Sequence, residues 1–136
     1  MATFPSPEAA EAAFYEAFQA GDPQAMRQVW RDGPESVCIH PGGSRLQGGD
    51  LILESWDDIL PSMRGVIIHP TEITRIPGNE LVVHVLRENL YVNGERRGVM
   101  LATNGYRLDG QSWRMVLHHA SADPEPTPEP QDDRIH

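Results

Sequence analysis

The sequence has a single cysteine and no lysine. Because Cys38 stands alone among 136 residues, no internal disulfide can form, and a lone thiol is typical of a reducing compartment such as the cytoplasm. All 11 basic residues are arginine and they face 20 acidic residues, which leaves a formal net charge of −9. We therefore expect no nucleic-acid partner, because binding to phosphates requires positive charge.

Long hydrophobic runs are missing as well. Asp, Glu, Arg or Pro interrupts every apolar stretch before the roughly 20 residues that a membrane helix needs, and the start MATFPSPEAAEAAF lacks the basic and apolar parts of a signal peptide. The spacings HxxxH and HExxH and paired cysteines are also absent. We expect a cytoplasmic protein without a membrane segment, a metal site or another cofactor.

Helix signals fill the first half of the chain. Caps, first-turn prolines and apolar residues at helical spacing bound three helices. Two short strands are expected between the second and third helix. The helices are predicted within residues 6–21, 22–34 and 48–61, and the short strands at residues 36–40 and 44–47.

Strand patterns dominate from residue 66 onward. Four long segments, at residues 66–76, 80–92, 98–108 and 112–121, are separated by the turn sequences PGN, NGE and DGQ. Short turns of this kind predict an antiparallel meander. Helices followed by strands are typical of an α+β fold whose sheet covers the helices with one face. Gly98 and Gly105 are expected bend points within the strands.

The carboxyl-terminal segment differs in composition from the rest. Residues 122–136 are rich in acidic residues and proline and contain almost nothing apolar, so they cannot bury enough surface to fold alone. We predict one domain at residues 1–121, followed by a disordered acidic tail at residues 122–136.

Three segments resemble a known family. They are AFYEAFQAGDPQAMRQVW at 13–30, VCIHPGGSRLQGGDLILESW at 37–56 and WRMVLHHAS at 113–121. With the order of elements, they are similar to small bacterial SnoaL-like proteins of the nuclear transport factor 2-like superfamily, over residues 8 to about 121. The resemblance implies a cystatin-like cone, in which three helices pack on a strongly curved mixed or antiparallel sheet. It also implies a mostly apolar pocket and a homodimer formed through the outer face of the sheet.

His40 is the leading candidate for chemistry. It ends a short strand, the following Pro41 restricts the chain, and imidazole titrates near neutral pH, which suits a general base. In ketosteroid isomerase, which shares this fold, the matching dipeptide is a catalytic Asp followed by Pro, and Tyr15 is the candidate for that enzyme's tyrosine. The alternative is a structural histidine that bonds to a backbone group and fixes the turn at Gly42 and Gly43.

Other polar and aromatic residues are candidates for the pocket wall. Tyr15, Trp30 and Trp56 lie on helices that should cover the sheet, where they form either pocket walls or plain core. Asn104 is expected in the cone interior with one residue of the Arg87-Glu88-Asn89 run, because alternation sends Glu88 to the opposite face from its neighbours. The competing hypothesis for Glu88 is a cross-strand salt bridge to an arginine.

The pair His118-His119 lies near the end of the last strand. Adjacent strand residues point to opposite faces. His119 shares its alternation with Trp113 and Met115, which predicts that it faces the interior, while His118 would lie on the outer face.

Two hypotheses for function remain open. The first is a non-catalytic SnoaL-like homodimer whose pocket holds a small apolar molecule with a polar group. The second is a cofactor-independent isomerase, dehydratase or cyclase in which His40 is the general base and Tyr15, Asn104 or His119 polarises a substrate oxygen.

Overall fold

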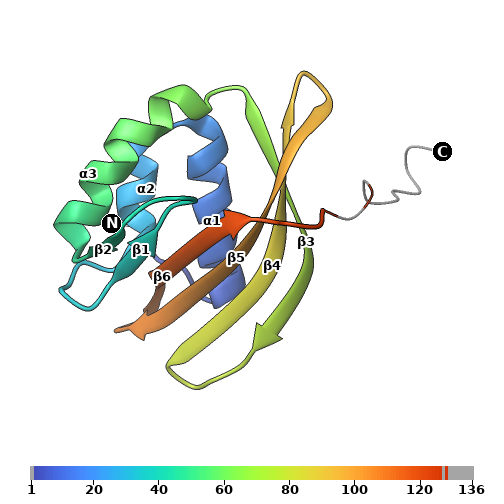
Figure 1. Cartoon of the computed structure of the whole chain (residues 1–136). Helices are drawn as coiled ribbons and strands as arrows, with labels where there is room; N and C mark the ends of the chain where they lie inside the picture. Colours follow the sequence, from blue (N-terminus) through green and yellow to red (C-terminus); the bar gives the residue numbers. More distant parts are fainter. Residues whose placement is uncertain (1, 127, 129–136) are drawn as a thin grey trace.

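Helices pack on one face of a curved, six-stranded sheet (Figure 1). The computed structural model describes residues 2–126 and 128. Its elements are α1 (Pro7–Ala20), α2 (Pro23–Val29), β1 (Val37–Ile39), β2 (Arg45–Gln47), α3 (Gly49–Ile59), the 3-10 helix η1 (Leu60–Met63), β3 (Val66–Ile76), β4 (Leu81–Val92), β5 (Glu95–Asp109) and β6 (Ser112–Ala122). The predicted α+β class and order of elements are confirmed.

The sheet is mixed, with strand order β2-β1-β6-β5-β4-β3. β3 to β6 form the predicted antiparallel meander, and β1 pairs with β2 in the antiparallel sense and with β6 in the parallel sense. The parallel pairing sets Cys38 beside His118. It therefore brings the strand that leads into His40 next to the end of β6.

Capping residues fix where the first two helices begin. The Ser6 side chain accepts a hydrogen bond from the N–H of Ala9, and Asp22 caps α2 in the same way, as the sequence predicted. Gly21 ends α1 with φ of 62°, and a Cβ there would lie 2.7 Å from the carbonyl oxygen of Leu60. Only glycine fits this junction, which holds α1 against η1.

Three register shifts curve the sheet. They fall at Thr71/Thr74 in β3, at Leu90/Tyr91 between β4 and β5, and at Gly105/Tyr106 between β5 and β6. Gly98 pairs with Leu90, so both predicted bend points, Gly98 and Gly105, lie beside a shift. Each bulge adds a residue to one strand and bends the ladder toward the helices.

The hydrophobic core lies between the helices and the concave face of the sheet. Phe14 of α1 is fully buried, and its ring centroid lies 4.9 Å from that of Tyr15 and 5.6 Å from that of Trp56. Edge-to-face contacts of this kind stabilise aromatic pairs beyond the burial of their area. They fix α1 and α3 relative to each other above the sheet.

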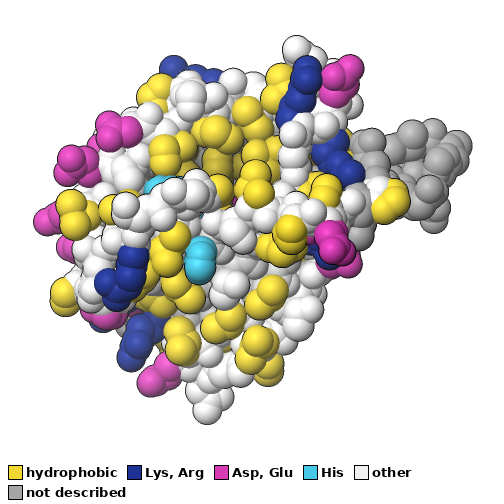
Figure 2. All heavy atoms as spheres, in the orientation of Figure 1, with side chains coloured by type: hydrophobic (Ala, Val, Ile, Leu, Met, Phe, Trp, Pro, Cys, Tyr) yellow, Lys and Arg dark blue, Asp and Glu magenta, His cyan; other side chains and the backbone are white. Residues whose placement is uncertain are grey.

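The opposite, convex face of the sheet leaves apolar side chains exposed. Ile67 is 55% exposed, Ile76 52%, Leu81 48% and Val85 41%. On the side of the molecule in Figure 2, hydrophobic side chains are spread over much of the surface, and groups of Asp, Glu and Arg side chains lie between and around them. This face differs in character from an ordinary charged surface.

The chain stays on the sheet beyond residue 121. β6 runs to Ala122, the N–H of Asp123 donates to Val99 O, and the Asp123 carboxylate pairs with Arg87. Most of the predicted tail, residue 127 and residues 129–136, lies outside the described residues. Within the described part of the chain, no helix combines the length and apolar character needed to cross a membrane.

Candidate functional site

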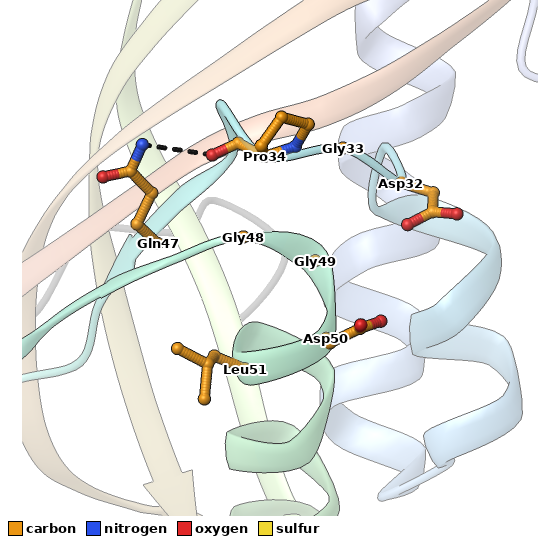
Figure 3. A pocket seen from close by; sticks show the side chains of 8 residues that line it. All are labelled: Asp32, Gly33, Pro34, Gln47, Gly48, Gly49, Asp50 and Leu51. Atoms are coloured by element: carbon orange, nitrogen blue, oxygen red, sulfur yellow. Dashed lines mark hydrogen bonds between the residues drawn. The ribbon is translucent and has the colours of Figure 1, made fainter.

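One cavity of about 400 Å³ lies where β2 leads into α3 (Figure 3). Its wall combines the glycine backbone at residues 33, 48 and 49 with the side chains of Pro34, Gln47 and Leu51 and of two solvent-exposed acids, Asp32 and Asp50. The Gln47 amide drawn in Figure 3 already donates to Pro34 O at 3.1 Å. The two acids face solvent and no buried polar side chain lines the cavity among the described residues, so this cavity is a weak candidate for a site.

A second cavity, of about 250 Å³, lies between the helices and the concave face of the sheet. The helices contribute Phe18, Trp56, Ile59 and Met63, and the sheet contributes Ile68, Leu90, Met100 and Ala120. Three titratable residues, His40, Glu88 and His118, complete the wall beside Pro41. A mostly apolar cavity with a few converging polar groups is the usual form of a small-molecule site.

Glu88 is the only carboxylate among the described residues of this wall. It points inward from β4 and its side chain is 3% exposed. Burial raises the pKa of Glu88 to about 7; the hydrogen bond from Tyr15 opposes that rise and the charge of Glu11 adds to it. The predicted alternative, an arginine salt bridge, is wrong, because Glu88 bonds to Tyr15 while Arg87 pairs with other acids on the opposite face.

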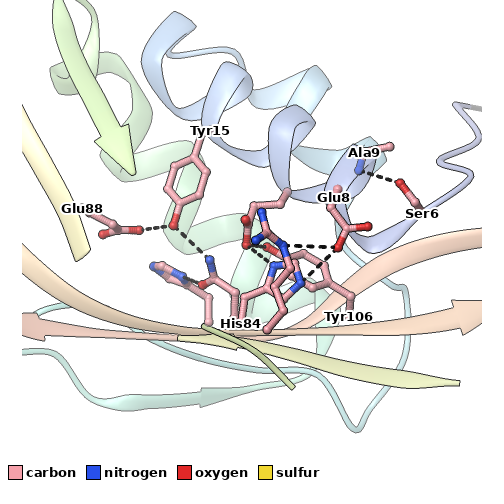
Figure 4. Close-up of polar contacts among 11 residues, drawn as sticks. Ser6, Glu8, Ala9, Tyr15, His84, Glu88 and Tyr106 are labelled. Atoms are coloured by element: carbon pink, nitrogen blue, oxygen red, sulfur yellow. Dashed lines mark hydrogen bonds and ion pairs between the residues drawn. The ribbon is translucent and has the colours of Figure 1, made fainter. Parts of the chain in front are cut away.

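A chain of buried hydrogen bonds joins Glu88 to His118. The Tyr15 hydroxyl donates to Glu88 Oε2 at 2.6 Å (Figure 4). Asn104 Nδ2 donates to the Tyr15 oxygen at 2.9 Å, and Asn104 Oδ1 lies 2.7 Å from Nδ1 of His118. Burial also keeps the pKa of Tyr15 well above its usual value, so the hydroxyl remains a donor. Two residues of the cavity wall are thus connected through Tyr15 and Asn104, which lie behind it.

The predicted orientation of the two C-terminal histidines is wrong. His118 is 1% exposed and lines the cavity, with its ring 4.9 Å from that of Phe14, whereas His119 is exposed. The reason is the register shift at Gly105: Gly105 pairs with Leu117 but Tyr106 pairs with Met115, which leaves one extra residue in β6. A bulge reverses the alternation beyond it.

His118 is held as a neutral ring. Burial lowers the pKa of His118 to about 3, and His40 and His119 act in the same direction. A neutral imidazole has one N–H donor and one nitrogen acceptor. His118 therefore serves as a hydrogen-bonding group in the wall at neutral pH.

His40 lines the cavity from the loop that follows β1. Its Nε2 lies 2.9 Å from Ser55 Oγ of α3, and its ring stands edge-on to Trp56 at 4.7 Å between centroids. Cys38 Sγ lies 3.7 Å from the same nitrogen, and burial raises the pKa of this thiol to about 12, so it stays protonated. Burial lowers the pKa of His40. The ring is thus fixed by a side chain of another element, while its carbonyl oxygen accepts the turn bond from Gly43 N–H.

A second buried polar cluster lies beside this network, on the same faces of α1 and the sheet (Figure 4). The Glu11 carboxylate accepts from His84 Nδ1 at 2.8 Å and from the Tyr106 hydroxyl at 2.7 Å. Its charge contributes to the raised pKa values of Tyr15 and Glu88. The cluster therefore raises the pKa of the wall residue Glu88 through the charge of Glu11, although the three members of the cluster do not line the cavity wall.

The remaining predicted residues divide between the wall and the core. Trp56 lines the cavity, whereas Trp30 is packed in the core at the end of α2, where its backbone bridges Met115. The indole N–H groups of Trp30 and Trp56 are buried and have no partner among the described residues. Within that part of the chain, no group of three or more His, Cys, Asp or Glu residues is placed to hold a metal ion.

Comparisons with known proteins agree with this architecture. Residues 8–124 match the family model of the SnoaL-like domain. A structure from Thiobacillus denitrificans, provisionally described as a calcium/calmodulin-dependent protein kinase type II association domain, is 36% identical over 90% of this chain and 98% of that chain, with a TM-score of 0.81. No curated protein matches the sequence.

Two further solved structures share the fold at lower identity. One from Streptomyces avermitilis, provisionally described as a dehydratase from the NTF2-like family, is 24% identical over 87% of this chain and 94% of that chain, with a TM-score of 0.78. One from Nostoc punctiforme, of unknown function with a cystatin-like fold, is 12% identical over 86% and 88% of the two chains, with a TM-score of 0.73. The resemblance seen in the sequence is confirmed: the chain belongs to the SnoaL-like domain family, with the cystatin-like fold of NTF2-like proteins.

Proposed function

We propose that this protein is a cofactor-independent enzyme that transfers a proton at a carbon atom of a small, mostly apolar molecule, with Glu88 as the catalytic residue. The observation that carries the proposal is a carboxyl group, 3% exposed, in the wall of an apolar cavity. Burial raises its pKa to about 7, close to the pH at which a general base both is ionised and accepts a proton readily.

The reaction needs no co-reactant. The Glu88 carboxylate removes a proton from carbon, so that a C–H bond breaks and an O–H bond forms on Glu88. The hydrogen on Glu88 exchanges with solvent. Glu88 then gives a proton to another carbon, which is isomerisation, or to a departing hydroxyl group, which leaves as water and completes a dehydration. Either route restores the carboxylate. The Streptomyces avermitilis neighbour provisionally described as a dehydratase falls within this reaction class.

This proposal moves the base from His40 to Glu88. Burial lowers the pKa of His40, which weakens it as a base, and Ser55 already engages one of its nitrogens. His40 then contributes a fixed, neutral ring opposite the strands. The non-catalytic hypothesis differs in one measurable respect, because it requires ligand binding without exchange of protons.

We also propose a homodimer formed through the convex face of β3 to β6, in the cytoplasm. The exposed apolar residues Ile67, Ile76, Leu81 and Val85 lie on this face, where a second copy would bury them. A reducing compartment suits the free thiol of Cys38.

Deuterium incorporation tests the proposed chemistry even though the natural substrate is unidentified. The protein is incubated in D₂O with small cyclic β-hydroxyketones and β,γ-unsaturated ketones, and loss of C–H signals is followed by ¹H NMR. We expect exchange with at least one compound, and a decrease of about 100-fold or more in Glu88→Gln. Glu95→Gln, whose side chain is 73% exposed on β5, is the matched control and should leave the rate unchanged.

Binding without exchange in the wild type would favour the non-catalytic hypothesis. Exchange that persists in Glu88→Gln would assign the base to another residue, with His40 the next to be replaced.

A further inference from the structure

The hydrogen-bond chain behind the cavity has a defined direction. An ionised Glu88 can only accept, so in the 2.6 Å hydrogen bond the Tyr15 hydroxyl is the donor and Glu88 Oε2 the acceptor. The Tyr15 oxygen then accepts from Asn104 Nδ2 at 2.9 Å. This fixes the orientation of the Asn104 amide, because its carbonyl oxygen must face His118.

The direction of the chain determines the tautomer of His118. Asn104 Oδ1 is an acceptor, so Nδ1 of His118, 2.7 Å away, must carry the proton and donate it. The ring is neutral, as its complete burial requires. Its other nitrogen, Nε2, therefore has a lone pair and no hydrogen.

His40 follows the same logic through a different partner. The Ser55 hydroxyl donates its single hydrogen to Ile52 O at 2.6 Å, so its oxygen must accept from Nε2 of His40 at 2.9 Å. Nδ1 of His40 is then the nitrogen with the lone pair; Cys38 Sγ, 4.0 Å from it, is at most a weak donor. Each of the two histidine rings in the cavity wall thus donates its one N–H to a protein side chain, and its other nitrogen has a lone pair.

The wall consequently has acceptors but lacks positive charge. Among the described residues that line it there is no arginine, and the indole N–H of Trp56 is itself buried. An anion would find no cation. An ammonium ion would find one carboxylate, that of Glu88, which already accepts from Tyr15, and it would lose its hydration in a mostly apolar space. At roughly 30 Å³ for each water-sized group, a cavity of about 250 Å³ holds about eight non-hydrogen atoms.

We infer that the ligand of this cavity is an uncharged hydroxyl compound, an alcohol or phenol of about eight non-hydrogen atoms, whose O–H donates to Nε2 of His118. The inference names the substrate class for the proposed function, and it rests on that function because both place the ligand in this cavity. It selects the hydroxylated substrates within the proposed reaction class. His118 is then a positioning residue, and Glu88 remains the proton-transfer group.

Four probes with one ring and different head groups test the inference. They are cyclohexanol, cyclohexanone, cyclohexylamine and cyclohexanecarboxylate, and their dissociation constants are measured by ligand-observed NMR at about pH 8, where Glu88 is mostly ionised. We expect cyclohexanol to bind about tenfold more tightly than cyclohexanone, and the two charged probes to bind more weakly than either.

Two variants locate the source of the preference. His118→Phe keeps an aromatic ring but removes the acceptor, so the alcohol and the ketone should bind equally. His119→Phe, the same substitution at the adjacent exposed residue, is the matched control and should retain the tenfold preference. If His118→Phe does not fold, long-range ¹H–¹⁵N NMR on the wild type decides, because it distinguishes a protonated Nδ1 from a protonated Nε2.

The inference is overturned by any of four results. These are equal or tighter binding of the ketone or a charged probe, an alcohol preference that survives in His118→Phe, a protonated Nε2 on His118, or no binding by any probe. Its failure can be separated from failure of the proposed function. An alcohol preference without deuterium exchange would refute the catalytic proposal alone, whereas exchange without the preference would refute the inference alone.

Discussion

Replacement of Glu88 by glutamine should change the stability of the protein in a pH-dependent manner. The amide keeps the size of the side chain and can still accept from the Tyr15 hydroxyl, but it cannot ionise. In the folded protein burial raises the pKa of Glu88 to about 7, from 4.5. The folded state therefore binds this proton more tightly than the unfolded chain does. The unfolding free energy is therefore highest below about pH 4.5, where Glu88 is neutral in both states. It falls as the pH rises to about 7, because the unfolded chain ionises Glu88 before the folded protein does.

The size of the effect follows from the two pKa values. The change from 4.5 to about 7 corresponds to about 3 kcal/mol of unfolding free energy, lost by the wild type on going to high pH. Between about pH 5 and about pH 8.5, most of this loss, about 2 to 3 kcal/mol, should appear. Glu88→Gln does not undergo this loss. Between the two pH values, its unfolding free energy should therefore rise by that amount relative to the wild type. A weaker hydrogen bond from Tyr15 lowers the unfolding free energy of the variant by the same amount at both pH values, so it cancels when the two values are subtracted.

Urea unfolding followed by tryptophan fluorescence measures this difference at 25 °C. The sequence has 3 tryptophans, two of them buried beside helices that cover the sheet. Glu95→Gln, with a side chain 73% exposed, is the control and should differ from the wild type equally at both pH values. A free-energy difference between wild type and Glu88→Gln that is the same at both pH values would refute the raised pKa, and with it the principal support for Glu88 as the base.

Three further predictions concern stability and assembly. In the wild type the unfolding free energy falls as the pH falls, because the unfolded histidine binds a proton near pH 6.5 and buried His118 only near about pH 3. His118→Phe lacks this loss, so in urea unfolding its free energy should rise by about 2 kcal/mol relative to the wild type between about pH 7.5 and pH 5. An unchanged difference would contradict the effect of burial on His118. Val85→Arg, on the convex face, should convert the proposed homodimer to a monomer in light scattering, and a monomeric wild type would refute the proposed dimer. Ser6→Ala should cost about 1 kcal/mol of unfolding free energy, because the cap bond to Ala9 N–H is lost; an unchanged midpoint would show that this helix end contributes little.

The fold was predictable because its signals are local. Ser6, Asp22 and Gly21 mark helix ends through the hydrogen bonds and backbone angles that those residue types favour. The turns after residues 76, 92 and 109 connect neighbouring strands, so the meander followed from chain order. The end of α2 was placed too late, because Trp30 leaves the helix to bridge Met115, a contact between distant parts of the chain that has no local signal.

The site was only partly predictable, since its geometry depends on contacts between distant strands. His40 and Trp56 were identified and line the same cavity. The sequence left Glu88 between the cone interior and a salt bridge. Both alternate sets of side chains in β4 begin with apolar residues, so the pattern does not decide which set faces inward. His118 was assigned to the wrong face because a single extra residue in β6 reverses the alternation.

The buried polar network is difficult to explain by stability alone. Glu88, Tyr15, Asn104 and His118 are each at most 4% exposed, and buried polar side chains of this kind are often no more stabilising than apolar ones of the same size. Glu88 weakens the fold as the pH rises, and His118 weakens it as the pH falls, through pKa shifts in opposite directions. A purely structural core could replace all four with apolar residues of similar volume at little cost. Their placement at two points of one cavity, joined through Tyr15 and Asn104, instead keeps a carboxylate near pKa 7 and fixes a neutral acceptor beside it. That combination is what the proposed chemistry requires, and on this proposal the pH dependence of stability and the binding of hydroxyl compounds should respond to the same residues.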